Sequence, residues 1–562
     1  MKPSKSLTTF LVFAFVLLAL SVVGVSAQDM GAPVEKIIVL SNTQAEDPIE
    51  FETTRQLVEN MRQLGFEVEQ EASPFSVYSD TVWFNRLNEP EALGGDGWQM
   101  TAWRMVARPE RMDPDEFVVN LFSSATAENG YNFVGYNNPD YDALAQAQRG
   151  ETDPEKRRDD IFQAQELIAN DVPYVYVAHP SLPQLVRTDV WDPESIVDAQ
   201  GIGIQNFWTW IGMKPLGDQK DIITNTASAL LAINPLYIAG DAPSRLTELI
   251  WDRLMRIGPD GLAQPWAAES VEWEDNIHAL VRIRDGMMWH DGQPVTVDDV
   301  KFSFEVPKTG ESPMYAPFTS RIASVDIVDD HTLRFTLTEP WVAFEVASLA
   351  KVNLIPKHIW EPIINDLMTK DENAESLTGN DPETKIGSGP FRYVAWVENE
   401  QAILEANPDH FSPPQAARFI MKIIPNAEST LGQIQTGELN FLREWSGDSS
   451  VLKDVADADP NITLFASPDL GFRFFGFNLR FPPFDNADIR RAVAYAMPKQ
   501  SIIQNIFKGF AVPADSYVSS AIDYWHNPDL PQYAFSLDTA RQVLTDAGFT
   551  WDAEGHLHYP AS

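Results

Sequence analysis

The pattern of apolar and polar positions predicts a strand–helix–strand unit early in the chain. Residues 35–40 (EKIIVL) form a compact apolar run, short enough for a buried strand. A helix is expected over residues 52–64, where apolar residues recur on one helical face, and Gly65 stands where a helix commonly ends. Residues 66–68 then alternate as a second strand. Strand, helix and strand in this order indicate an α/β fold.

Similar patterns recur along the rest of the chain. Residues 262–305 are dense in short strands and turns, which indicates a region rich in β-structure. Further strands are expected over residues 174–179, 331–337 and 391–404, and further helices over 153–171, 483–508 and 536–547. Residues 214–220 (KPLGDQK) are typical of a linker. A chain of 562 residues exceeds the roughly 250–300 residues that one core supports, so at least two lobes are expected.

The charge balance narrows the set of partners. Lys and Arg number 41 against 81 Asp and Glu, which gives a formal net charge of −40. Nucleic acid requires a basic face, and anionic membrane surfaces repel such a chain, so neither partner is expected. Cysteine is absent, which excludes disulfides, thiolate metal sites, a cysteine nucleophile and a lipid-modified cysteine.

The first 27 residues have the three parts of a secretory signal peptide. Lys2 and Lys5 precede an uncharged apolar run over residues 10–25, and Val25-Ser26-Ala27 supplies small residues for cleavage. The run is shorter than the roughly 20 residues that a membrane span needs. We expect cleavage before Gln28 and a periplasmic or extracellular protein that is not a lipoprotein. An uncleaved membrane anchor is the alternative.

No compact catalytic motif is visible in the sequence. The chain has no phosphate-binding glycine loop, no HExxH and no GxSxG elbow. His556 and His558 would share a strand face, but two imidazoles without a third ligand make a poor metal site. His290, in WHDG, is expected to pack beside a turn. We therefore expect a protein that is not an enzyme and that uses no metal or other cofactor.

Several blocks from residue 221 onward follow one another in a recognisable order. They are DIITNTASALLAINPLYIAGDAP, ALVRIRDGMMWHDGQPVTVDDVKFSFE, IGSGPFRYVAWVENEQAILEANPDHF, FNLRFPPFDNADIRRAVAYAMPKQSII and DTARQVLTDAGF. The first resembles the mature N-terminus, and the second the signature block, of the family 5 extracellular solute-binding proteins. These are the dipeptide-, oligopeptide- and nickel-binding proteins of ABC importers.

The stretch before residue 214 resembles the C-terminal part of the same family. The blocks that carry this resemblance are TTRQLVENMRQLGFEVEQ, NFVGYNNPDYDALAQAQ and DPEKRRDDIFQAQELIANDVPYVYVAHP. Both halves of one family member are thus present in swapped order. A circular permutation is the economical explanation, and a damaged tandem or a mis-assembled gene model is the alternative. In the permuted fold, residues 28–182 and 481–562 would form lobe II, and 183–480 lobe I with a β-rich subdomain near 262–380.

The resemblance implies a periplasmic-binding-protein-like α/β fold, in which a hinge joins two lobes and one lobe carries an extra β-rich subdomain. It also implies a function, because lobes that close on a hinge can hold a ligand between them. The protein would be a monomer that captures a peptide or other small solute and delivers it to ABC permease subunits in the membrane. A secreted hydrolase and a ligand-presenting sensor component are the alternatives.

Carried over to this chain, the resemblance also implies where the solute would be held. The hinge is expected at residues 472–478 and in the segment after His179. The residues expected to contact ligand are Asn234, Tyr237, Phe391, Arg473, Phe475, Asn478, Trp103, Arg104, Arg108 and Asp113. Aromatic walls with a few polar groups suit variable peptide side chains, and core packing is the alternative for each aromatic residue.

One stretch departs from the pattern of the resembled family. Peptide-binding members carry an Asp just before an Asp-Pro pair, where it holds the α-amine of the ligand, but here the run is WRMVARPERMDP. Arg104, Arg108 and Arg111 crowd this place, and arginine prefers carboxylate or phosphate groups. They favour an anionic or carboxylate-bearing solute. Alternatively, these arginines pair with nearby acids.

The last residues, WDAEGHLHYPAS (551–562), have the pattern of a hairpin that feeds a further strand. In the resembled family such a hairpin runs into an apolar strand, and VEKIIVL (34–40) has the pattern of that strand. The permutation therefore predicts that the C-terminal hairpin lies beside residues 34–40.

Overall fold

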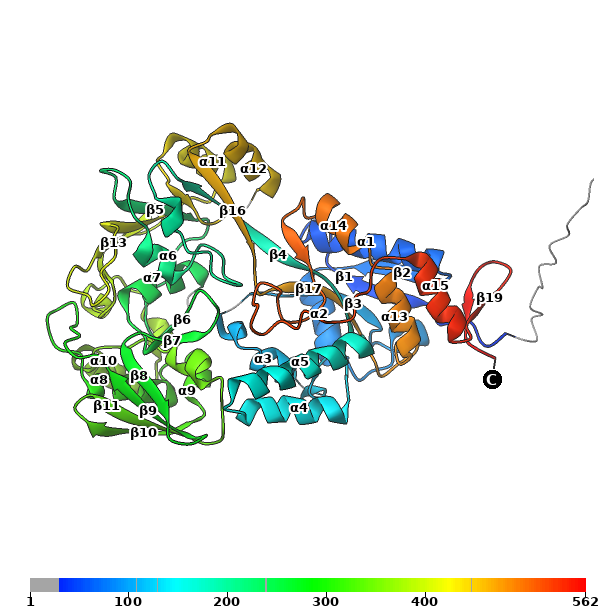
Figure 1. Cartoon of the computed structure of the whole chain (residues 1–562), viewed down its shortest axis with the longest axis horizontal. Coiled ribbons are helices and arrows are strands. Elements are labelled where there is room, and N and C mark those ends of the chain that lie inside the picture. The colour runs from blue at the N-terminus through cyan, green and yellow to red at the C-terminus, as the bar shows by residue number, and fades with distance from the viewer. Residues whose placement is uncertain (1–29, 108, 129, 238–239, 446, 562) are drawn as a thin grey trace, which may run out of the picture.

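The computed structural model describes residues 30–107, 109–128, 130–237, 240–445 and 447–561. The predicted signal peptide and Arg108 lie outside the described residues. Figure 1 shows two bodies of mixed helices and strands, connected by strands that pass from one to the other. The predicted two-lobed α/β class is confirmed. We call the body that contains the first described residues lobe II and the other lobe I.

A sheet with the strand order β15-β4-β17-β3-β1-β2 extends from lobe II into lobe I, and β16 and β18 also pair with β4. Lobe II contains β1, β2, β3, β17, β18 and the first half of β4, whereas β15 and β16 pair with the second half of β4 on the lobe I side. The strands are β1 Ile37–Ser41, β2 Val68–Ala72, β3 Met100–Met105, β4 Tyr174–Arg187, β15 Phe441–Leu442, β16 Ile462–Pro468, β17 Phe472–Phe477 and β18 Ala511–Pro513. β1 lies between β2 and β3 and is parallel to both. The chain therefore leaves β1 toward one side and later returns on its other side.

β4 belongs to both lobes. Its first half pairs with β17 and β18, and its second half, from Ser181 onward, pairs with β16. β4 thus changes partners near Pro180, and residues 469–471 make the second connection, between β16 and β17. The strand continues past its predicted end at residue 179. Pro180 has no backbone N–H to donate and stands where β4 changes partners, and its carbonyl oxygen accepts a hydrogen bond from the Asp469 amide at 2.9 Å. We call residues 178–183 the β4 crossing.

Helices cover both faces of the lobe II sheet. They are α1 Pro48–Gln63, α2 Phe75–Phe84, α3 Asp115–Phe122, α4 Pro139–Gly150, α5 Pro154–Asp171, α13 Ala487–Tyr495, α14 Lys499–Asn505 and α15 Leu537–Asp546. α1 starts earlier than predicted, because Asp47 caps its first turn and Pro48 fits the first helical position. The helix predicted over 483–508 is interrupted at Pro498, which yields α13 and α14.

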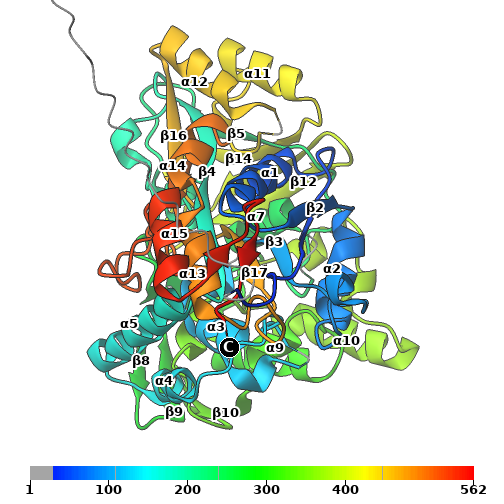
Figure 2. The ribbon, with the colours of Figure 1, turned by 90° about the vertical axis from the view of Figure 1, so that its right-hand side faces the viewer.

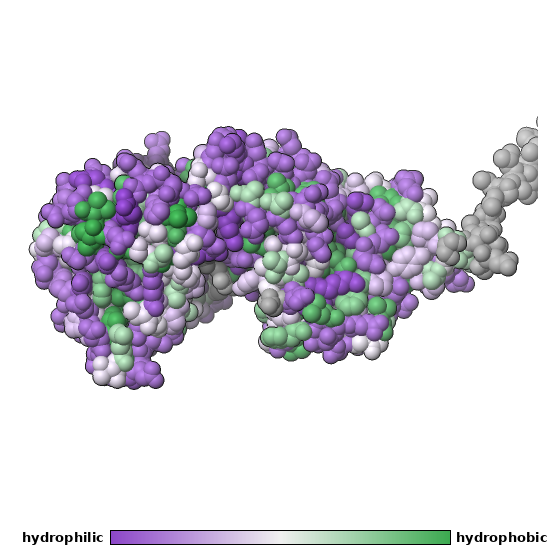
Figure 3. All heavy atoms as spheres, turned by 90° about the horizontal axis from the view of Figure 1, so that it is seen from below, coloured by the Kyte–Doolittle hydropathy of each residue, from purple (hydrophilic) through white to green (hydrophobic). Residues whose placement is uncertain are grey.

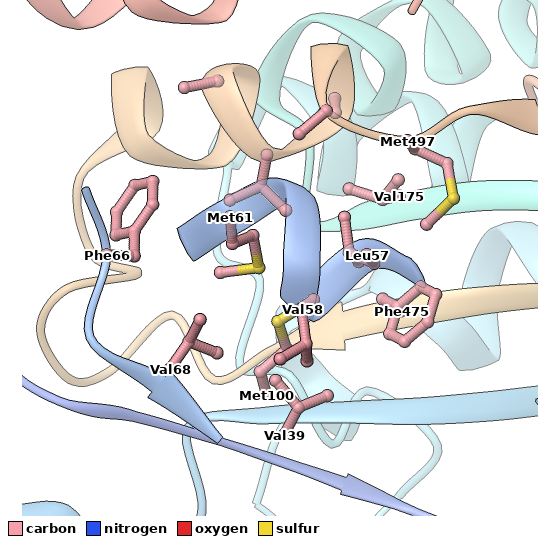
Figure 4. Packing of buried hydrophobic residues seen from close by; sticks show 14 of the residues in the cluster. Val39, Leu57, Val58, Met61, Phe66, Val68, Met100, Val175, Phe475 and Met497 are labelled. Carbon is pink, nitrogen blue, oxygen red and sulfur yellow. The ribbon is translucent and has the colours of Figure 1, made fainter. Parts of the chain in front are cut away.

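The main core of lobe II lies between α1 and the sheet. Figure 4 shows Val58 of α1 beside Val39 of β1 and Met100 of β3, and Leu57 beside Val175 and Phe475, all in one buried cluster. Leu57, Val58 and Met61 of α1 are each 3% exposed or less. Burying a side chain of this size stabilises the fold by about 1.5–3 kcal/mol, so the periodicity that predicts the helix also fixes its packing face.

Lobe I contains a smaller sheet of order β12-β13-β14-β5 and a β-rich subdomain of order β10-β11-β9-β8. The first consists of β5 Asp221–Thr226, β12 Phe391–Val397, β13 Gln401–Ala406 and β14 Arg418–Ile423, with helices α6 Phe207–Gly212, α7 Asp241–Ile250, α11 Ala427–Thr436 and α12 Ser449–Ala458. The second consists of β8 Ala268–Trp273, β9 His278–Ile283, β10 Ile322–Asp329 and β11 Thr332–Leu337, with the β6 Met255–Ile257 and β7 Ala263–Pro265 pair nearby and helices α8 Val297–Glu305, α9 Ala316–Thr319 and α10 Lys357–Lys370.

The C-terminal hairpin, β19 Thr550–Trp551 with β20 Leu557–His558, lies beside the first described residues. The Val34 amide donates to the Leu557 carbonyl at 2.9 Å, and the Tyr559 hydroxyl donates to Glu35 at 2.6 Å. Figures 1 and 2 place this hairpin at the end of lobe II that lies farthest from lobe I. The predicted proximity is therefore present, while the permutation itself stays a proposal.

The surface in Figure 3 is mostly hydrophilic, with separate small apolar patches. This agrees with the strongly acidic composition. Within the described ranges, no helix has the length and apolar character that crossing a membrane requires.

Candidate functional site

Strand ends from both lobes meet at the β4 crossing. β17 lies antiparallel between β3 and the first half of β4, so β3, β1 and β4 run in the same direction, toward lobe I. Ligands of open α/β sheets bind outside the carboxyl ends of strands, where the chain leaves to both sides. β1 is such a point. On the lobe I side, the end of β5 lines a pocket together with Leu182 and Pro183 of the crossing.

The lobe II side carries a group of charged residues that we call the Asp47 cluster: Asp47, Glu50, Tyr78, Arg104 and Arg473. The Asp47 carboxylate caps α1 by accepting the Glu50 amide at 3.0 Å. Its other oxygen accepts Arg473 Nη1 at 2.8 Å and Arg104 Nη1 at 3.4 Å. The two arginines are brought together because they are register partners on β17 and β3. The Asp47 side chain is 5% exposed, whereas that of Arg104 is 52% exposed.

Glu50 and Tyr78 form the buried floor of the Asp47 cluster. Glu50 Oε1 accepts the Asn42 amide and the Tyr78 hydroxyl, both at 2.8 Å. Burial raises the pKa of the Glu50 carboxyl above its usual value, against the opposing effect of these hydrogen bonds. Burial, together with Glu50, also raises the pKa of Tyr78, which keeps the phenol protonated and donating.

The lobe I side carries a second group, the Arg443 cluster: Arg443, Asp241 and Glu444. Arg443 follows β15, which runs antiparallel to β4 and so leads back toward the crossing. Its guanidinium donates to the Asp241 carboxylate, to Glu444 Oε2 at 2.9 Å and to the Asn225 carbonyl at 3.1 Å. Asp241 is the first residue of α7. Partial loss of water acts to raise its pKa, but Arg245 and Arg443 outweigh that effect and lower the pKa to about 2.

A pocket of about 680 Å³ lies over the Arg443 cluster. Its walls include Gln205, Thr226 at the end of β5, and Trp445. The Trp445 indole Nε1 is buried and has no hydrogen-bond partner in the part of the chain that the structure describes. A pocket that presents two exposed carboxylates, held in place by a buried guanidinium, can hold a polar solute in a fixed orientation.

The structure separates the sequence-predicted site residues into several groups. Arg104 and Arg473 come together at the crossing. Trp103 is 5% exposed, because neighbouring residues on a strand point to opposite faces, and its ring packs on Tyr78 at 5.8 Å. Phe475 lies inside the core (Figure 4), and Phe391 is fully buried in lobe I.

The remaining predicted residues make internal contacts. Asn234 is 2% exposed and donates to the Ala374 and Leu377 carbonyls, while Tyr237 is half-buried. Asn478 is fully buried and donates to the Arg86 and Trp98 carbonyls.

Asp113 and Arg111, which the sequence places next to the Arg-rich stretch, are both buried in ion pairs. Asp113 accepts both ends of the Arg157 guanidinium, at 2.6 and 2.8 Å. Arg111 donates to Glu116 at 3.1 Å, and its guanidinium lies over the Phe117 ring. Pairing with nearby acids, the alternative named above, therefore describes Arg111 fully and Arg104 in part.

Sequence reasoning did not single out Asp47, Asp241, Arg443, Glu444 or Trp445. The two aspartates had a detectable signal, since Asp47-Pro48 and Gly240-Asp241-Ala242-Pro243 both have the composition of a helix start after a strand. Arg443 has no local signal. Its place depends on the long-range pairing of β15 with β4.

Comparison with known proteins gives one family match and several relatives. The family model described as bacterial extracellular solute-binding proteins, family 5 Middle, matches residues 263–560. The oligopeptide-binding protein AppA of Bacillus subtilis is 26% identical over 336 residues, which is 58% of this chain and 59% of that protein. The dipeptide-binding protein of Escherichia coli is 26% identical over 341 residues, 56% of this chain and 61% of that protein. The chain thus spans about three-fifths of the length of these relatives.

Solved structures give matches of similar extent. The structure of AppA from Bacillus subtilis with a nonapeptide has 23% identity and a TM-score of 0.42, covering 61% of this chain and 68% of that one. NikZ from Campylobacter jejuni with Ni(L-His) has 24% identity and a TM-score of 0.43, covering 62% and 66%. The family match takes in more than half of the residues, and the chain belongs to the bacterial extracellular solute-binding proteins, family 5.

Proposed function

We propose that this protein is the extracytoplasmic solute-binding component of an ABC importer, which captures a peptide or other small solute between its lobes. The observation that carries the proposal is the pair of charged clusters on either side of the β4 crossing. A ligand that contacts both lobes favours the closed form by its added contacts. The closed protein then docks as a monomer on membrane permease subunits. No bond is made or broken, in keeping with a family that is solute-binding rather than catalytic.

The exposed charges of the two clusters suit a solute that carries both signs. On lobe II the exposed group is Arg104, which can donate hydrogen bonds to a carboxylate of the solute. On lobe I the exposed groups are Asp241 and Glu444, with side chains 58% and 39% exposed, which can accept a cationic group. The carboxylate-bearing solute favoured by the sequence is thereby narrowed to a dipolar one. A free peptide meets this description, in line with the peptide-binding names of several relatives.

A peptide series with one charge removed at a time tests this proposal. Binding of trialanine, its N-acetylated form and its C-amidated form is measured by calorimetry. Each modification is expected to weaken binding at least about tenfold, the effect of roughly 1.4 kcal/mol. Glu444→Gln should reduce the penalty for acetylation, since Asp241 remains, and Arg104→Gln should abolish the penalty for amidation.

A matched control is Arg334→Gln, which removes an exposed arginine that pairs with Glu274 in the β-rich subdomain. It should leave all three affinities unchanged. Mass spectrometry of solutes that co-purify with the exported protein identifies the natural ligand. Failure to bind any co-purified solute or any peptide of the series would overturn the solute-binding function.

We further propose that residues 1–27 are a cleaved signal peptide and that the mature protein is periplasmic or extracellular without a lipid anchor. The support is the three-part pattern of the segment and the absence of cysteine. The intact mass of the secreted protein tests this. A mass that includes residues 1–27 or an attached lipid would contradict it.

The swapped order of the family blocks is, we propose, a circular permutation. The two ends of the original chain would be joined at residues 214–220, and the new ends would be the hairpin and residues 30–35. A linker of a few residues from Pro560 to Gly31, with new termini opened between Leu216 and Lys220, restores the family order. This variant should fold with a midpoint temperature within a few degrees of the parent and bind the same solutes. A variant that does not fold would contradict the permutation.

A further inference from the structure

A second pocket lies on lobe II and shares no lining residue with the pocket at the Arg443 cluster. It encloses about 760 Å³, somewhat more than the 680 Å³ of the other. Its walls come from α1, the start of α14, residues 513–515 at the end of β18, and residues 532–535. We call it the Lys499 pocket. Its volume is in the range of pockets that hold small molecules, about 300–1,000 Å³.

One side of the Lys499 pocket is apolar. It is lined by Met497, Pro498, Pro513, Tyr533 and Phe535, of which Met497 and Pro498 are buried. The Phe535 side chain is 49% exposed, although a residue of this size is normally placed where it can lose contact with water. An aromatic or alkyl group of a ligand that covered this side would remove apolar surface from water.

The Lys499 ammonium is one of the charged groups that line the pocket, and only part of its hydrogen-bonding capacity is used. Nζ donates to the Ala514 carbonyl at 2.6 Å, and an ammonium has three N–H donors. Within the described residues no carboxylate lies at ion-pair distance from it. Asp515, the acid that favours its charge most, has both oxygens engaged, by His526 Nε2 at 3.0 Å and Gln532 Nε2 at 2.8 Å.

The electrostatic environment of Lys499 agrees with this geometry. Loss of water lowers the pKa of the Lys499 ammonium to about 8, and Asp515 only partly opposes the change. Besides Lys499 and Asp515, the charged groups that line the pocket are Arg55 and Glu59 on α1. Arg55 donates to Glu52 at 2.8 Å, so it is already paired. Lys499 is therefore the cation that would gain most from an anionic partner.

We propose that the Lys499 pocket is a second ligand site, which binds a small carboxylate with an aromatic or alkyl body. The carboxylate accepts the free N–H donors of Lys499, and the body covers Tyr533 and Phe535. The net charge of −40 does not prevent this, because charges farther than about 8 Å are largely screened at physiological salt. A charge-assisted hydrogen bond at the lysine acts within that distance.

Two probes of equal shape test the proposal: phenylacetate and its neutral counterpart, phenylacetamide. Calorimetry on the full-length mature protein should show phenylacetate binding at least tenfold more tightly than phenylacetamide. Lys499→Met should remove this difference, whereas Arg55→Met on the same pocket wall should keep it. Above pH 8 the affinity for phenylacetate should fall toward tenfold per pH unit, while that for phenylacetamide stays constant, since only the protonated lysine attracts the carboxylate.

A second variant guards against loss of the fold in Lys499→Met. Ala534→Trp adds bulk at an exposed loop position and should weaken both probes at least tenfold. Arg334→Gln in the β-rich subdomain should alter neither affinity, and the readout is the affinity of these two probes rather than that of a peptide, so this result is separate from that of the solute-binding proposal. Equal affinity for the two probes, no binding of either at millimolar concentration, or an unchanged preference in Lys499→Met would overturn the second site.

Discussion

The two lobes place the same kinds of residue at the β4 crossing but bury opposite charges. In lobe I the arginine is buried, with Arg443 2% exposed, while its partners Asp241 and Glu444 are 58% and 39% exposed. In lobe II the acid is buried, with Asp47 5% exposed, while Arg104 is 52% exposed. Both arrangements use a strand that leads toward the start of a helix, β1 with α1 and β5 with α7.

The difference shows which charges are structural and which are available to a solute. A buried charge is held by its partners, because leaving it unpaired costs several kcal/mol, on the order of 3–5. An exposed charge in the same pair contributes roughly 0–1 kcal/mol and can change partners at little cost. The lobe I face therefore presents carboxylates, and the lobe II face presents a guanidinium. The comparison predicts unequal effects for residues of the same type in the two lobes.

The largest expected effect is that of removing the buried arginine. Arg443→Met should lower the free energy of unfolding by about 2–3 kcal/mol, because the buried Asn225 carbonyl loses a charged donor, while the two exposed carboxylates that also lose it can be hydrated. Arg104→Met should lower it by less than about 1 kcal/mol. Urea unfolding followed by fluorescence measures both values. Equal losses for the two arginines would remove the distinction between the lobes.

Removal of the acids should give the reverse order. Asp47→Ala deletes the cap of α1, worth about 1 kcal/mol, and leaves Arg473, whose side chain is 13% exposed, without its closest acid. We expect a total loss of about 2–3 kcal/mol. Asp241→Ala should cost less than about 1 kcal/mol, because its carboxylate is 58% exposed and Arg443 keeps Glu444 and the Asn225 carbonyl as partners. A larger loss for Asp241→Ala in the same urea experiment would contradict the assignment.

Local patterns were sufficient for much of the fold but not for this contrast. The strand at 37–41, the helix that follows Asp153 and the helix that follows Ser536 were predictable, since each depends on a short periodic run and its cap. The split at Pro498 and the continuation of β4 through Pro180 depend on which strands are available as partners. Exposure was also beyond the sequence: both faces of β3 are buried from Met100 to Trp103, so no alternation along the strand marks Arg104 as its exposed residue.

The smallest expected effect is on the pH dependence of stability, where the acids of the two clusters should act in opposite directions. The pKa of Asp241 is lowered to about 2, so its contribution is present above an unfolded value near 4 and is lost as the pH falls toward 2. The pKa of Glu50 is raised, so its contribution is present below the unfolded value near 4.5 and is lost as the pH rises through the folded value.

Asp241→Asn should therefore flatten the acid side of the stability profile, by less than about 1 kcal/mol because solvent screens this exposed group. Glu50→Gln should instead flatten the decline above the unfolded pKa of the glutamate, while its amide oxygen still accepts the Asn42 amide and the Tyr78 hydroxyl. Unfolding midpoints measured from pH 2 to 7 separate the two, and a shift of the same sign in both variants would show that the lobes do not differ in which charge they bury.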